Sequence, residues 1–180
     1  MPAMNTTSCL RLVATAALSS LVLAGCLSSP PVPPPQVVDA TPAAQRWAAV
    51  QQAAGVDDTE LSVQPLRDPE VDDLREQALA QRDSGQLAAA AATLDQALAL
   101  VDGDPAVLQE RAEVALLQGQ WAQAEQWSKR ALELGSRTGP LCRRHWATIE
   151  QARLARVEPE NAASARAQID GCTVPGIKRY

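Results

Sequence analysis

The sequence predicts an all-α fold in which antiparallel helix hairpins stack as a solenoid. Alanine and leucine dominate its 180 residues, with no phenylalanine and one tyrosine, and such a composition favours helices. Two stretches that begin at Leu74 and Leu108 match when the first is moved forward by 34 residues. Each stretch places apolar residues three or four apart, as one face of a helix requires. A repeat of this length predicts stacked helix pairs.

Residues 1–25 have the layout of a secretory signal. Arg11 precedes an apolar stretch over 12–23, which is shorter than the roughly 20 residues that a membrane-spanning helix needs. The stretch ends in Leu23-Ala24-Gly25-Cys26, which resembles a bacterial lipobox. The resemblance implies cleavage before Cys26, acyl chains such as palmitate on that cysteine, and a mature chain anchored to a membrane. A buried helix and a secretory cut without lipid are the alternatives.

Residues 26–40 are expected to form a proline-rich tether. Proline fixes φ and lacks an amide donor, so the segment should be an extended spacer. Over residues 27–40 it reaches at most roughly 40–45 Å. Leu27 stands where enteric lipoproteins of the inner membrane carry an aspartate, so its presence favours the outer membrane, with the inner membrane as the alternative.

Residues 41–68 are expected to hold one short helix followed by an acidic loop. Thr41 would cap the helix, Pro42 would occupy its first turn and Gly55 would end it. The helix could pack on the first repeat through Trp47. The paired acids Asp57 and Asp58 in the loop are expected to be solvated.

Residues 69–136 contain the two clear repeats. Gly85 and Gly119 lie where the chain must turn between helices, a place that favours a residue tolerant of positive φ. The pairs Asp68-Pro69 and Asp104-Pro105 supply a side-chain cap and a first-turn proline. Small alanines let the paired helices approach closely, at positions 78, 90, 112 and 124.

The period of 34 with this pattern resembles the tetratricopeptide repeat. Leucine replaces the usual early aromatic at Leu74 and Leu108, while Trp121 fills one aromatic position. Residues 137–180 are expected to hold a degraded third repeat that caps the stack, with helices over 140–156 and 159–169 and with Trp146 and Ile149 facing inward. Stacked repeats need such caps because the last unit exposes an apolar face.

The resemblance implies a concave groove lined by the first helix of each repeat, which would hold a peptide or helix of a partner protein. The positions that correspond are Asp72, Arg75, Leu79 and Arg82 in repeat one, and Ala106, Gln109, Glu113, Leu116 and Leu117 in repeat two. The alternative for the two adjacent leucines is packing against the third helix pair.

Cys142 and Cys172 are the cysteines left after Cys9 departs with the signal and Cys26 takes the lipid. An oxidising compartment favours a disulfide between them, with two free thiols as the alternative. His145, the one histidine, lies three residues after Cys142. One histidine and two cysteines make a poor metal site or catalytic pair.

The motifs of catalysis and phosphate binding are missing from the sequence, so we expect no enzyme and no cofactor beyond the lipid on Cys26. The net charge of −5 without a larger basic cluster argues against a nucleic-acid partner. We expect a lipid-anchored, periplasm-facing scaffold or adaptor that binds an envelope protein. The alternative is a structural or regulatory subunit of an envelope complex, such as a peptidoglycan or pilus and secretin complex, without a free peptide groove.

Overall fold

The computed structural model describes residues 39–55 and 66–173. The lipobox residues Leu23, Ala24, Gly25 and Cys26, the tether up to residue 38 and the acidic loop over 56–65 lie outside the described residues. Within the described part, the helices are α2 (Ala43–Ala54), α3 (Pro69–Asp83), α4 (Leu87–Leu100), α5 (Pro105–Leu117), α6 (Trp121–Leu134), α7 (Gly139–Ala155) and α8 (Pro159–Gly171). This part of the chain has no strand, which confirms the all-α prediction.

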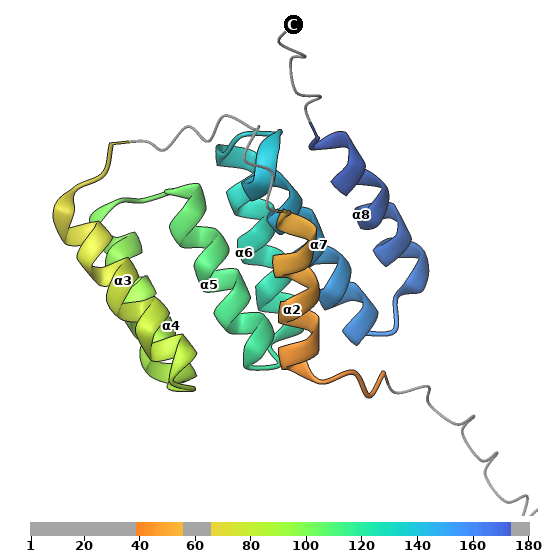
Figure 1. The fold of residues 1–180 in the computed structure, drawn as a ribbon, viewed down its shortest axis with the longest axis horizontal. Coiled ribbons are helices and arrows are strands. Elements are labelled where there is room, and N and C mark those ends of the chain that lie inside the picture. The colour runs from red at the N-terminus through yellow and green to blue at the C-terminus, as the bar shows by residue number, and fades with distance from the viewer. Residues whose placement is uncertain (1–38, 56–65, 174–180) are drawn as a thin grey trace, which may run out of the picture. The chain divides into compact units, whose positions relative to one another are not determined.

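Consecutive helices pair as hairpins, α3 with α4, α5 with α6 and α7 with α8 (Figure 1). The hairpins also stack in chain order, because α4 packs on α5 and α6 packs on α7. The predicted pair over 140–156 and 159–169 is therefore a real third hairpin, formed by α7 and α8. Ile149 is fully buried there, and Trp146 is half-buried against it.

The hairpin starts confirm the predicted caps. The Asp104 side chain accepts hydrogen bonds from the amides of Ala106 and Val107, and the Asp68 side chain accepts one from Glu70. Thr41 is not a cap, however. The helix α2 begins one residue later than predicted, with Pro42 at the N-cap and its carbonyl accepting the first backbone bonds.

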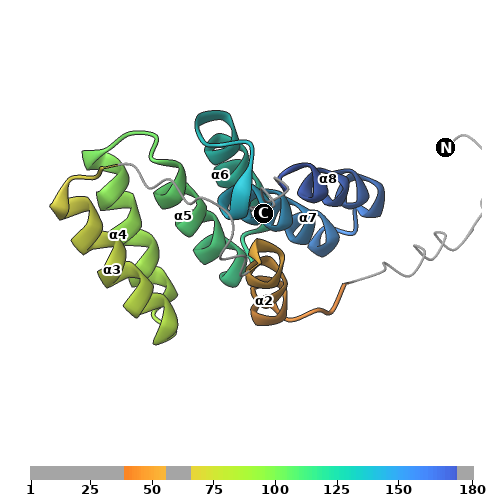
Figure 2. The same ribbon diagram turned by 45° about the horizontal axis from the view of Figure 1, so that its top comes forward.

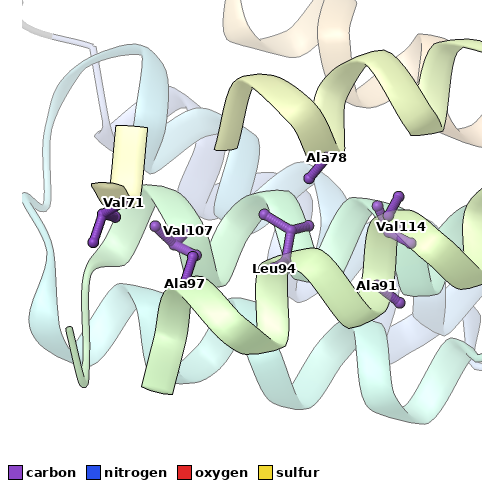
Figure 3. Packing of buried hydrophobic residues seen from close by; sticks show 8 residues of the cluster. Val71, Ala78, Ala91, Leu94, Ala97, Val107 and Val114 are labelled. Atoms are coloured by element: carbon purple, nitrogen blue, oxygen red, sulfur yellow. The ribbon is translucent and has the colours of Figure 1, made fainter. Parts of the chain in front are cut away.

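The core between the first hairpin and α5 is made of small and branched side chains (Figure 3). Leu94 of α4 is fully buried between Ala78 of α3 and Val114 of α5. Ala90, Ala112 and Ala124 are also fully buried. Small side chains at these places let the helix axes approach, as the repeat predicts.

All three first helices end in the same Schellman turn. Gly85, Gly119 and Val157 each adopt positive φ, at 78°, 73° and 59°. Each donates its amide to the carbonyl three residues earlier, and the next amide bonds the carbonyl five residues before it. Val157 therefore occupies the position that glycine holds in the other two turns. Because this turn lacks a glycine, no glycine in the sequence marks where it lies.

Replacing Val157 by glycine should stabilise the protein by about 1 kcal/mol, because a β-branched residue is strained in the left-handed region. Val157 is 44% exposed, so little packing is lost. Urea titration followed by far-UV circular dichroism measures the change. Gly85→Val is the matched control, since nothing lies within 4 Å of a Cβ placed there. It should lower stability by a similar amount, and a destabilising Val157→Gly variant would contradict the strain.

Candidate functional site

Helix α2 lies against α5 and α7, on the side where the predicted groove would open (Figures 1 and 2). Arg46 and Val50 are buried at this contact. Val50 packs in one cluster with Leu116 of α5 and Ala147 of α7. The helix therefore docks on the second and third hairpins, whereas the sequence predicted packing on the first repeat.

Glu113 of α5 joins α2, α5 and α7 through its carboxylate, which is fully buried. From α2, Trp47 Nε1 donates to Oε2 at 3.1 Å and Gln51 Nε2 donates to it at 2.9 Å. From α5, Gln109 Nε2 donates to Oε1 at 2.9 Å. From α7, Arg144 donates through Nε at 2.8 Å and lies within 2.6 Å through Nη2. Side chains from three helices thus bind one carboxylate.

The C-terminal end of α2 is held by Arg143 of α7. Its Nε and Nη2 both donate to the Ala54 carbonyl, at 3.0 Å and 2.6 Å. Near the other end, Arg46 Nη1 donates to the Gln151 carbonyl at 3.3 Å, and Nη2 lies 2.7 Å from Asp39. An α7 side chain thus binds the last carbonyl of α2, and an α2 side chain binds an α7 carbonyl near the other end.

The predicted groove positions of repeat one lie on α3. Arg75 makes two hydrogen bonds to Glu110 of α5, at 2.6 Å and 2.9 Å, and one to Asp72 at 3.1 Å. Arg82 extends its guanidinium over the ring of Trp47, 4.9 Å from the centroid. Through this contact Trp47 also touches the first repeat, although α2 as a whole packs on the second and third hairpins.

The predicted groove positions of repeat two are mostly covered. Gln109, Glu113 and Leu116 are fully buried. Their placement on an open groove is wrong, because α2 and α7 lie over them. Leu116 instead packs as the alternative expected, against the third hairpin. Of the repeat-two positions, Ala106 and Leu117 remain half-buried. Leu79 of repeat one is half-buried as well.

A buried polar network adjoins the Glu113 carboxylate. Gln109 Oε1 accepts from Ser128 Oγ at 3.2 Å, and it lies 2.7 Å from His145 Nδ1. Gln109 Nε2 donates to Thr148 Oγ1 at 2.8 Å. Because an amide oxygen can only accept, the proton of His145 lies on Nδ1. Helices α5, α6 and α7 are thereby fixed in register by side chains that sequence reasoning did not connect.

Stability should fall as the pH drops below 6.5, because burial and the nearby Arg144 lower the pKa of His145 to about 3. The unfolded chain then binds a proton that the folded chain excludes. The free energy of unfolding should decrease by about 1.4 kcal/mol between pH 7.5 and pH 5.5. Urea midpoints at these two pH values measure the loss.

His145→Gln is the control for this pH dependence, because it keeps a donor near Gln109 and removes the titration. Its stability should stay level over the same range. Glu125 does not interfere there. Hydrogen bonds from Arg156, Lys129 and Arg153 outweigh burial and lower the pKa of Glu125 to about 2, so its contribution is lost only below pH 4.5. An equal slope in the control would contradict the assignment to His145.

The described residues contain no cluster of three or more histidine, cysteine or acidic side chains that could hold a metal ion. In the same part of the chain, no helix has the length and apolar character needed to cross a membrane.

The structure confirms the predicted disulfide, with Cys142 and Cys172 bonded at 2.01 Å. It joins the start of α7 to the residue after α8.

No protein-family model matches the sequence, and no curated protein matches it. A solved structure does match: the globular C-terminal domain of P. aeruginosa LpoP. The two sequences are 36% identical, and the structures superpose with a TM-score of 0.55. The match covers 58% of this chain and 99% of that domain.

Proposed function

We propose, because this chain belongs to the family of the globular C-terminal domain of P. aeruginosa LpoP, that it is a lipid-anchored envelope protein whose folded part binds another envelope protein. The observation that carries the binding role is the stack of helix hairpins, because stacked repeats offer extended surfaces to partners. The lipobox at Cys26 supplies the anchor in this proposal, with the outer membrane favoured by Leu27. The role is adaptor-like, without catalysis, nucleic acid or a cofactor other than the lipid.

Covalent capture in intact cells tests this function. A tagged full chain is crosslinked with formaldehyde, the membranes are solubilised, and the attached protein is identified by mass spectrometry. Cys26→Ser runs beside it. We expect one defined envelope protein on the anchored form and a strong loss on the unanchored form. Capture of nothing specific, or equal capture without the anchor, would overturn the proposal.

A second form of the function is favoured by the position of α2. In this form the chain is a structural or regulatory subunit of an envelope complex, and no partner segment enters the concave side. Trp47 and Gln51 already occupy the Glu113 carboxylate, as a bound helix would. The part of the predicted groove that is not covered in this way lies on α3.

Arg82 separates the two forms, because it lies on α3 with a side chain that is 13% exposed and paired with Asp83. If a partner segment binds along α3, Arg82→Gln should reduce formaldehyde capture severalfold. Arg166→Gln on α8 is the control, since it removes an arginine that is paired with Glu150 but is 74% exposed and far from α3 in the chain. Unchanged capture by Arg82→Gln would exclude a partner segment along α3 and would support the subunit form of the function.

A further inference from the structure

Helix α6 carries a second face that no other helix in the described part of the chain covers. Its inward face holds Ala124, Ser128 and Ala131, which are buried. On the other side lies an open hollow of about 780 Å³, lined by α6 along its length and by Arg111 of α5. The lining positions on α6 recur every three or four residues, from Gln123 to Leu134. Such spacing forms one continuous stripe along a helix.

The hollow offers apolar anchors beside arginine. Trp127 is half-buried there, with the Arg111 guanidinium 5.7 Å from its ring centroid. Leu134 at the end of the helix is 54% exposed. Tryptophan and arginine are the residues most enriched at the energetic centres of protein interfaces. The stripe therefore has the composition of a surface that binds protein.

The charges that line the hollow are mostly positive. Arg111, Lys129 and Arg130 face one carboxylate, that of Glu133. Arg130 pairs with Asp102 at 2.7 Å, but both side chains are largely exposed, at 49% and 88%. Such a surface pair contributes only about 0–1 kcal/mol. A carboxylate from a partner can replace Asp102 at little cost.

The other two cations are also incompletely satisfied. Lys129 pairs with Glu125, which Arg153 and Arg156 already bind. Arg111 Nε donates to Asp95 at 2.8 Å, while its Nη1 is buried without an acceptor among the described residues. A buried donor without a partner costs about 1–3 kcal/mol.

We propose that the hollow over α6 binds an acidic, amphipathic segment of the envelope partner, with its carboxylates on Arg130 and Lys129 and its apolar side chains on Trp127 and Leu134. This inference rests on the proposed function and names the surface and the chemistry of the partner. The C-terminal residues of this chain do not fit that description, because Lys178 and Arg179 are basic. The concave side is not needed for this contact.

A photo-crosslinking amino acid at Gln126, an exposed residue that lines the hollow, tests the surface in intact cells. The full chain carries it, and Gln168 on the exposed face of α8 takes it in a control. We expect an adduct from Gln126 and none from Gln168. Mass spectrometry of the crosslinked peptide should place it in a partner segment with several acidic residues beside apolar ones.

Charge reversal supplies the second arm. Arg130→Glu should reduce the Gln126 adduct by about fivefold or more. Arg166→Glu, which alters an arginine that is 74% exposed on α8, should leave it unchanged. An adduct insensitive to Arg130→Glu would overturn the inference. So would a basic crosslinked segment, or an adduct to a second copy or to residues 56–65 of this chain.

Formaldehyde capture is measured in the same cells. If it succeeds while Gln126 gives no adduct, the proposed function stands and the α6 surface is wrong. If both fail, the binding role itself fails.

Discussion

Replacing Glu113 by glutamine should lower the free energy of unfolding by about 3 kcal/mol. Breaking a buried ion pair typically costs about 3–5 kcal/mol, because the remaining charge stays buried without a counter-charge. The side chain of Arg144 is 24% exposed, so it can recover some hydration, which places the loss near the lower end. Urea titration of wild type and variant measures it.

The structure also predicts where this loss should be felt. Glu113 accepts from Trp47 and Gln51, so the polar side of α2 depends on its charge. Amide hydrogen exchange should therefore quicken in α2 more than in α3 or α4. Glu133→Gln removes an exposed carboxylate from α6 and should change stability by less than about 0.5 kcal/mol. Equal effects of the two substitutions would show that Glu113 does not hold α2.

The hairpins could be predicted from sequence because their signals are local. The pairs Asp104-Pro105 and Asp68-Pro69 predict the starts of the first helices. Gly85 and Gly119 predict two of the turns, because these turns require a residue that adopts positive φ. Val157 adopts the same backbone without the glycine, so the third turn could be placed only approximately.

The position of α2 could not be predicted, because it depends on contacts far apart in the chain. Its most buried long side chain is Arg46, whereas arginine is normally expected at the surface. The resemblance to the tetratricopeptide repeat assigned Gln109 and Glu113 to the groove of the first helices. That resemblance could not reveal that Trp47, 66 residues earlier, would bind the Glu113 carboxylate. Repeat positions therefore predict which helix faces could line a groove. Whether such a face is open depends on whether another helix, here α2, packs over it.

Removing the disulfide through paired Cys142→Ala and Cys172→Ala substitutions should destabilise the protein by about 3–4 kcal/mol. The bond spans a separation of 30 residues, and a loop of that size restricts the unfolded chain by about this free energy. Both cysteines are 1% exposed, so alanine also leaves a small unfilled space beside Ile149. Urea titration should show a lower midpoint. The dependence of stability on urea should steepen, because the unfolded chain exposes more surface without the crosslink.

The location of the bond argues that the loss should be concentrated in the last hairpin. Helix α8 packs on α7, and stacked repeats are stabilised mainly by their nearest neighbours. At the same end, the Gly139 amide donates to the Cys172 carbonyl at 2.7 Å. Hydrogen exchange should therefore quicken first in α8, while α3 to α5 keep their protection. Ser164→Ala, on the exposed side of α8, serves as the control and should change little. A loss below about 1 kcal/mol would mean that packing alone holds the cap and that the bridge adds little restriction to the unfolded chain.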